Sequence, residues 1–174
     1  MTHFKNALIR KAIPGEEQQI HDVHMRSIRE VCVKDHGEDE IKGWGFRELG
    51  NRWYEAIKQG RVYVVELEGS ICGVGSIDKL IDEETSESFA YIHALYFTPE
   101  IIGLGLGKQV LTKLLNLAKK WKITTIKLDS TITALEFYQK QGFRRNGEMK
   151  KVLIGGHPVT SYPLILSIKQ YPPD

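Results

Sequence analysis

The sequence predicts a mixed α/β (α+β) fold, in which about four helices pack on a central sheet of about seven strands. Short runs rich in β-branched and aromatic residues alternate with longer segments that carry apolar residues at helical spacing. Their order is strand, two helices, three strands, helix, strand, helix and two strands, which is not the strict alternation of a dinucleotide-binding sheet. With 174 residues, of which 41% are hydrophobic, we expect one domain over residues 1–174.

The N-terminal part is predicted to hold one strand and two helices. Ala7–Ala12 is a short strand-like run that ends at a Pro-Gly turn, and Glu16–Cys32 has apolar residues on approximately one helical face. The stretch Asp35–Phe46 is predicted to be irregular because glycines interrupt it. A second helix is expected over about Arg47–Gln59, where Gly60 is well placed to end it.

Three strands and the most regular helix are predicted for the middle of the chain. The runs Arg61–Glu66 and Ser70–Leu80 are joined by a turn at Glu68-Gly69. Ser88–Phe97 is rich in aromatic and apolar residues, which is typical of a central strand. A glycine-rich loop follows, and the helix after it, which ends near Trp121, has the clearest amphipathic pattern in the sequence.

The C-terminal part is predicted to hold a strand at Thr124–Ser130, a helix at Ile132–Gln141 and a terminal hairpin. The two hairpin strands, about Phe143–Ile154 and Val159–Lys169, flank Gly155-Gly156, which is a favourable turn.

Charge and composition show no sign of nucleic-acid binding, membrane insertion or a metal site. The formal net charge is +2, without the basic excess that is typical of nucleic-acid binding. No apolar run reaches the ~18 residues that a membrane span needs, and the polar N-terminus does not resemble a secretory signal. Cys32 and Cys72 are far apart and show no metal-ligand spacing. We expect a cytoplasmic protein with no nucleic-acid partner, no membrane contact and no metal; a homodimer is left open.

The glycine-rich loop is the richest local signal in the sequence. Glycines let the main chain approach a ligand closely, and the first amides of the following helix lack intrahelical acceptors and carry a partial positive charge. This combination suits a pyrophosphate. The alternative interpretation is a glycine-rich turn that serves only tight packing between strand and helix. The spacing of the glycines alone supports the two interpretations about equally. The candidate phosphate ligands are Ile102, Gly103, Leu104, Gly105, Leu106, Gly107 and Lys108.

Two common phosphate motifs do not fit this loop. A P-loop is excluded because Ile102 and Gln109 stand where that motif needs Gly and Ser or Thr. The dinucleotide fingerprint is excluded because Lys108 or Val110 would occupy its last glycine position. Nucleotide hydrolysis and nicotinamide chemistry therefore lose their best support.

Two stretches together resemble the GNAT superfamily of acetyl-CoA-dependent N-acetyltransferases. Leu95–Leu111 (LYFTPEIIGLGLGKQVL) contains the paired glycines of the family's acyl-CoA loop, and Leu128–Phe143 (LDSTITALEFYQKQGF) resembles its C-terminal signature. The resemblance covers roughly residues 61–143, in the right order and at the right separations. Two positions depart from it: Ile102 replaces the usual Gln or Arg, and Thr131 replaces the usual Asn.

The resemblance implies a GNAT-like fold with a mostly antiparallel sheet, and an enzyme that transfers an acetyl group from acetyl-CoA directly to a primary amine. The implied acceptor is a small molecule or a peptide. In relatives the strand before the loop pairs its main chain with the pantetheine arm, and Leu95, Tyr96 and Phe97 are the corresponding residues here. The Leu95 N–H is then the expected oxyanion donor, and Thr131 or Ser130 is expected to hydrogen-bond the pantetheine.

The resemblance also suggests two catalytic residues. Tyr138 corresponds to the tyrosine that often protonates the leaving thiolate; otherwise it is a packing aromatic. The strand glutamate that some relatives use as a base is replaced by Tyr91, so His93 is the candidate base, with a structural histidine as the alternative. By strand periodicity, Tyr91, His93, Leu95 and Phe97 are predicted to share one face.

The acceptor is expected to bind the helical region Ile28–Trp53 and the hairpin region Gly155–Tyr162, as in relatives. A second interpretation remains open beside the enzyme: an acyl-CoA-binding regulatory module with weak or no activity. The departures at Ile102 and Thr131 and the missing strand carboxylate give weight to that alternative.

Overall fold

One eight-stranded sheet runs through the computed structural model, which describes residues 6–168. The strand order is β1-β2-β3-β4-β5-β8-β6, and β7 pairs with β8 outside this path. The strands are β1 (Ala7–Lys11), β2 (Val62–Leu67), β3 (Ser70–Ile81), β4 (Ser88–Phe97), β5 (Thr125–Ser130), β6 (Arg144–Arg145), β7 (Lys150–Ile154) and β8 (His157–Ser167). Only β4 and β5 run parallel to each other among these pairs, so the mixed, mostly antiparallel sheet is confirmed.

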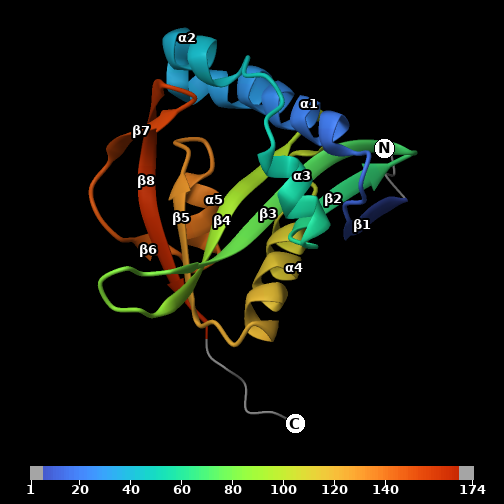
Figure 1. The fold of residues 1–174 in the computed structure, drawn as a ribbon. Coiled ribbons are helices and arrows are strands. Elements are labelled where there is room, and N and C mark those ends of the chain that lie inside the picture. The colour runs from blue at the N-terminus through green and yellow to red at the C-terminus, as the bar shows by residue number, and fades with distance from the viewer. Residues whose placement is uncertain (1–5, 169–174) are drawn as a thin grey trace.

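Helices cover both faces of the sheet. They are α1 (Glu17–Ser27), α2 (Val33–Trp44), α3 (Arg52–Lys58), α4 (Leu106–Lys120) and α5 (Leu135–Lys140), with a π-helical turn η1 (Ile28–Cys32) and a 3-10 turn η2 (Pro99–Ile101). Helices α1 and α3 pack on one face, and α4 and α5 pack on the other. Figure 1 shows α1 and α2 along one end of the sheet, with the β7–β8 pair reaching up to α2. No helix in residues 6–168 is long and apolar enough to cross a bilayer.

Helix α4 has the amphipathic form that the sequence predicts. Its buried face packs on the sheet through Leu111, Leu114 and Ala118, against Ile77 and Ile92 of the strands. Leu114 is completely buried, so truncation to alanine would cost about 2–5 kcal/mol of folding free energy. This packing holds the start of α4 in a fixed position relative to β4.

The prediction of an irregular stretch over Asp35–Phe46 is wrong, because α2 occupies most of it. Gly37 interrupts this helix with φ of 77° and ψ of 163°, a conformation outside the helical region that only glycine adopts readily. Ile41 and Trp44 are buried beyond the break and pack with Met25 of α1 and Ile28 of η1. The glycines therefore mark a kink and a close approach, and not the end of helical structure.

The C-terminal hairpin turns at Gly155-Gly156 as predicted, with Ile154 paired to His157. The predicted strand Phe143–Ile154 is divided into β6 and β7, which raises the number of strands to eight. The predicted end of the last strand, Lys169, lies outside the described residues.

Strand β4 contains a bulge at His93. Ser76 pairs with Ala94 and the next residue of β3, Ile77, pairs with Ile92, so His93 is an extra residue without a Cα partner. Because of this extra residue, Ala90 and Ile92 pack on the α4 face, whereas Ala94 and Tyr96 pack on the α1–α3 face.

The predicted shared face for Tyr91, His93, Leu95 and Phe97 is therefore wrong. Leu95 and Phe97 lie on the α4 face, where they pack near Val110. The rings of Tyr91 and His93 are 4.6 Å apart, and His93 contacts Asp78 on the α1–α3 side of the sheet.

Strands β4 and β5 diverge beyond their first residues. Their paired positions among the described residues are Ala90 with Ile126 and Tyr91 with Lys127. Strand β5 continues to pair with β8 as far as Ser130, whereas Ile92–Phe97 pairs with β3 alone. The sheet is therefore split, with one edge of the second half of β4 left open toward β5.

Candidate functional site

A cavity of about 450 Å³ occupies the split between β4 and β5. The start of α4 and one side of α5 form its walls, and Ser27, Val31 and Cys32 line it from α1 and η1. It gathers most of the residues that the sequence singles out: His93, Leu95, Tyr96, Phe97, Ile102, Gly103, Gly105, Leu106, Gly107, Lys108, Thr131 and Tyr138. Leu104 is the exception, because it is 46% exposed and does not line the cavity.

The glycine loop opens onto this cavity at the start of α4. Gly103 and Gly105 have φ of 84° and 78°, and a Cβ added at either would meet no atom within 4 Å. Gly105 is the N-cap of the 15-residue α4, whose first turn carries no acidic residue. Leu106, Gly107 and Lys108 line the cavity, and their main-chain amides lie in the first turn of α4, at the positive end of the helix dipole. These residues fit a pyrophosphate group.

Ile102 is less well placed to bind a phosphate than the rest of the loop. Its N–H donates to the carbonyl of Pro99 at 3.4 Å, closing the short turn η2. A phosphate oxygen would have to compete with that carbonyl for the Ile102 N–H. The Ile102 side chain is half exposed and contributes no polar group.

The open edge of β4 supplies a second set of main-chain groups. Leu95 pairs with Gly75 on the β3 side, while the other side of Ile92–Phe97 faces the cavity. An extended ligand with amide groups, such as a pantetheine arm, fits this edge in the way that an added strand would. The side chains of Leu95 and Phe97 meanwhile pack in the core near α4.

The turn between β5 and α5 forms the opposite wall. The Thr131 hydroxyl oxygen accepts the Ala134 N–H at 3.1 Å and keeps its own hydrogen for another acceptor. The Ser130 hydroxyl instead donates to the Thr131 carbonyl at 2.8 Å, so its hydrogen is already engaged. Of the two residues, Thr131 is the better donor toward the cavity.

Helix α2 fixes this turn from outside. The Ile132 N–H donates to Nε2 of the buried His36 at 3.0 Å, and Thr133 Oγ1 donates to Asp35 at 2.7 Å. The other ring nitrogen of His36 contacts Glu40 at 3.2 Å. The helix that was missed in the sequence therefore positions one wall of the cavity.

Tyr138 lies on α5 with its ring packed between Phe137 and Phe143, at centroid distances of 5.3 Å to each. The residue is 5% exposed and lines the cavity. Burial raises the pKa of its hydroxyl above the ordinary value near 10, and nearby Tyr91 raises it further. The phenol therefore remains protonated across the neutral range and can donate a proton.

His93 belongs to a polar group on the α1–α3 face. Its Nε2 lies 2.6 Å from Oδ2 of Asp78, and Arg61 lies 2.6 Å from the other carboxylate oxygen. The hydrogen bond from His93 lowers the pKa of Asp78 to about 2 despite burial, with a further contribution from Arg61. The His93 side chain is 22% exposed.

A second polar group lies beside the first. The Tyr91 hydroxyl donates to Asp129 at 2.6 Å, and Lys150 lies 2.9 Å from the other oxygen of that carboxylate. Burial raises the pKa of Tyr91 strongly, and Asp129 raises it further. Tyr91 is thus hydrogen-bonded to a carboxylate on the neighbouring strand β5.

Sequence reasoning did not single out Asp78 or Asp129. Asp78 belongs to no recognisable motif, and Asp129 lies in the stretch Leu128–Phe143 but at none of the positions that carry the resemblance; each is brought to the site by pairing between strands. The signal that could have found Asp78 is the hairpin register between β3 and β4, which places it opposite Tyr91.

Comparison with known proteins gives a family match over most of the chain. The pattern of the acetyltransferase (GNAT) family matches residues 25–143. The chain is also 24% identical over 141 residues to an uncharacterized N-acetyltransferase, YafP, of Escherichia coli (strain K12). That alignment covers 81% of this chain and 83% of the relative.

Solved structures show the same fold. A GCN5-related N-acetyltransferase from Rhodopseudomonas palustris superposes with a TM-score of 0.78 at 19% identity, over 94% of this chain and 96% of that one. The structure of yncA from Salmonella typhimurium with its cofactor acetyl-CoA has a TM-score of 0.70 at 20% identity, over 97% and 98% of the two chains.

Proposed function

Because the chain belongs to the acetyltransferase (GNAT) family and is an acetyl-CoA-dependent N-acetyltransferase, we propose that it transfers the acetyl group directly to a primary amine of a small molecule or peptide. The observation that carries the proposal is a single cavity that joins the glycine loop at the start of α4 to the open edge of β4. The first feature suits a pyrophosphate, and the second suits the amide-containing arm that follows it in acetyl-CoA.

Acetyl-CoA supplies an activated acetyl thioester when it is bound. In the proposal, the amides of Gly105–Lys108 bind its phosphates, and Thr131 and the main chain of Leu95–Phe97 bind its pantetheine. The Leu95 N–H donates to the carbonyl oxygen as negative charge develops there. The yncA relative, solved with acetyl-CoA, supports this use of the shared fold.

Two side chains complete the proposed chemistry. Tyr138 protonates the departing thiolate, because its phenol is buried, protonated and part of the cavity wall. His93 removes a proton from the attacking amine, directly or through water, since it lines the cavity from the opposite face.

The test is release of free coenzyme thiol in the presence of a panel of primary amines, followed by mass determination of the acetylated product. Amine-dependent thiol release, with an acetylated amine as the product, supports the proposal. Coenzyme binding without amine-dependent release across the panel would instead favour the regulatory module.

A further inference from the structure

The turn between β5 and α5 has two sides with different surroundings. Thr131, Thr133 and Ala134 line the cavity, whereas Ile132 does not. The Ile132 N–H donates instead to Nε2 of His36, on α2, at 3.0 Å. Neither partner of this hydrogen bond lines the cavity, and the two residues are 96 positions apart in the chain. A cavity wall is therefore held by a residue that no ligand in the cavity would touch.

This hydrogen bond requires a neutral imidazole. Because Nε2 of His36 accepts a main-chain N–H, it must carry a lone pair, and the single hydrogen of the neutral ring is then on Nδ1. Nδ1 lies 3.2 Å from a carboxylate oxygen of Glu40, which accepts that hydrogen. The His36 side chain is completely buried, and its ring packs 4.9 Å from the Trp44 ring. Both ring nitrogens are therefore committed to protein partners and neither is open to solvent.

Glu40 is fixed in turn by the C-terminal hairpin. Its carboxylate accepts the N–H of Thr160 and, at 2.9 Å, the hydroxyl of the same residue. The Nζ atom of Lys151, on β7, lies 3.3 Å from it. His36 is therefore the middle member of a chain of hydrogen bonds that runs from β8 through α2 to the turn.

The titratable groups that face His36 and its partners are Asp35 and Glu40 of α2, Lys151 of β7 and Cys32 of η1. Although burial raises the pKa of Glu40, its hydrogen bonds lower it to about 2. Burial raises the pKa of the Cys32 thiol to about 11. Neither group changes its charge in mild acid, which is the range in which a histidine ordinarily takes up a proton.

We propose that His36 is a positioning residue for coenzyme binding, which holds the β5–α5 turn in place while its ring is neutral and releases the turn when Nε2 is protonated. The inference rests on the proposed function, in which Thr131 binds the pantetheine arm. Protonation places a second N–H opposite the Ile132 N–H, so that two donors face each other and the hydrogen bond is lost. Thr131 directly precedes Ile132, so its hydroxyl then loses its fixed position in the cavity wall.

Calorimetric titration with coenzyme A tests the inference without any acceptor. It compares the parent with His36→Gln at about pH 5.5 and about pH 7.5, on either side of the ordinary histidine pKa. The glutamine oxygen can accept the Ile132 N–H at both pH values and cannot be protonated in this range. On acidification, the Kd of the parent should rise about threefold to tenfold more than that of His36→Gln, as expected for one lost hydrogen bond. The phosphates of the coenzyme titrate alike with both proteins, so the ratio between the proteins is the measure.

His36→Phe separates the hydrogen bond from the packing of the ring. Phenylalanine keeps an aromatic ring beside Trp44 but offers no acceptor to Ile132. At about pH 7.5 this variant should bind coenzyme A about threefold to tenfold more weakly than the parent, whereas His36→Gln should bind it as the parent does. Amide hydrogen exchange of the turn, without coenzyme, should be faster in His36→Phe than in the other two proteins. Thermal unfolding checks the fold of each variant, and the pH comparison with His36→Gln does not depend on His36→Phe.

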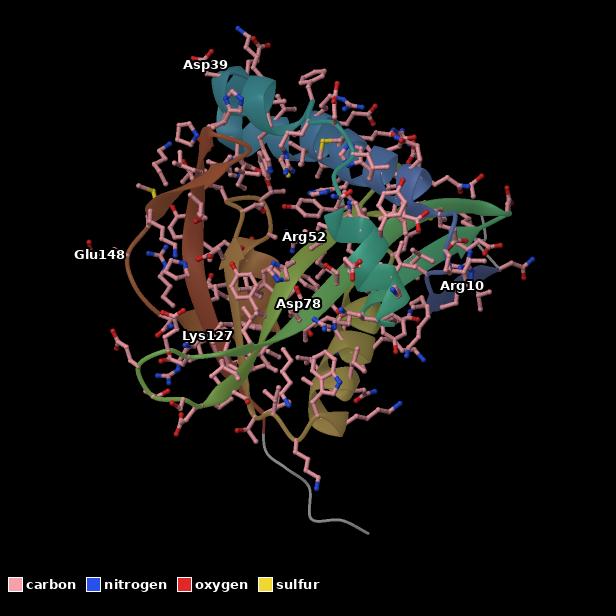
Figure 2. The ribbon with its side chains drawn as sticks, viewed as in Figure 1. Arg10, Asp39, Arg52, Asp78, Lys127 and Glu148 are labelled. Carbon is pink, nitrogen blue, oxygen red and sulfur yellow. The ribbon has the colours of Figure 1, made fainter. Side chains whose placement is uncertain are left out.

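Two control variants should keep the parental affinity and its pH dependence. His21→Gln is the matched control, because His21 is similarly buried and its Nε2 lies 2.7 Å from the Arg47 carbonyl, but it belongs to α1 and does not line the cavity. Asp39→Asn changes an exposed carboxylate of α2 itself, and Figure 2 shows Asp39 at the outer surface of this helix.

Three results would overturn the inference and leave the proposed function standing, because coenzyme A still binds in each of them. They are an equal pH dependence in the parent and His36→Gln, parental affinity in His36→Phe, and a pH dependence that His21→Gln removes as fully as His36→Gln does. If the parent does not bind coenzyme A at neutral pH, the proposed function fails and this inference fails with it.

Discussion

The Nε2 atom of His93 lies 2.6 Å from Oδ2 of Asp78, in a contact between the bulge of β4 and the neighbouring strand β3. With a pKa of about 2, Asp78 is ionised at neutral pH and accepts the hydrogen bond. Nε2 therefore carries the hydrogen, and Nδ1 is the atom left to accept a proton. Asp78 acts as a positioning residue in the proposed reaction.

His93→Gln should lower kcat and flatten the acidic limb of the pH–rate profile, because glutamine cannot take up the proton of the amine. The KM for acetyl-CoA should not change. Asp78→Asn should also lower kcat, since a neutral amide no longer fixes the tautomer and orientation of the His93 ring. An acidic limb that is identical in the parent and His93→Gln would assign His93 a structural role.

Tyr138→Phe should reduce kcat by about 10²–10⁴-fold, the usual contribution of a positioned proton donor. The aromatic ring still packs between Phe137 and Phe143, so thermal unfolding and coenzyme affinity should stay close to those of the parent. Steady-state kinetics with a fixed acceptor, alongside calorimetry with coenzyme A, separate these effects. Turnover at the parental rate would make Tyr138 a packing residue only.

Gly105→Val should abolish coenzyme binding, because its side chain would project from the N-cap of α4 into the cavity. In the parent, acetyl-CoA at about a hundredfold its Kd should stabilise the fold by ~2.7 kcal/mol. For a chain of this size that corresponds to a rise in Tm of roughly 5–10 °C. The variant should show no such rise.

Gly69→Val is the matched control for this substitution. Gly69 has φ of 81° and open space around its Cβ position, so both variants carry the same backbone strain of at least about 1–2 kcal/mol. Gly69 lies in the turn between β2 and β3, away from the loop, so the acetyl-CoA shift should persist there. Loss of the shift in both variants would point to general destabilisation.

Glu40→Gln should destabilise the fold at neutral pH by roughly 1–3 kcal/mol, the range for charge-assisted hydrogen bonds. Although burial raises the pKa of Glu40, hydrogen bonds from Thr160, His36 and Lys151 lower it to about 2. Because the folded-state pKa lies below the unfolded value of 4.5, this stabilisation is complete above about pH 5 and disappears as the pH falls toward 2.

Denaturant unfolding of the parent and Glu40→Gln at several pH values measures this difference, which should shrink between about pH 5 and 2. Glu136→Gln serves as the control, because its pair with Lys140 is exposed and should contribute about 0.5 kcal/mol or less. A difference for Glu40→Gln that stays constant with pH would contradict the assignment.

Features with a local sequence signal were predictable. The stripe of α4, the glycine loop and the Gly155-Gly156 turn each depend on neighbouring residues, and each lies where the sequence predicts it. Helix α2 was missed because the break at Gly37 hides the helical spacing on both sides of it.

The remaining features depend on pairing between strands. The bulge at His93 exists only in relation to the register of β3, and it reverses the face on which later residues of β4 point. The polar groups around Asp78 and Asp129 likewise join residues from separate strands. The spacing of residues within one segment of the sequence therefore cannot predict such contacts.

The open half of β4 has a consequence for the handling of the protein. An unpaired strand edge is a template for another extended chain, and natural proteins normally cover such edges to prevent aggregation. Here the cover would be the coenzyme, which pairs with the Leu95–Phe97 main chain in the proposed complex. Purified protein stripped of acetyl-CoA should therefore aggregate sooner on storage than loaded protein, and light scattering over time would record the difference. The cosubstrate would then also protect the open edge of β4 from pairing with other chains.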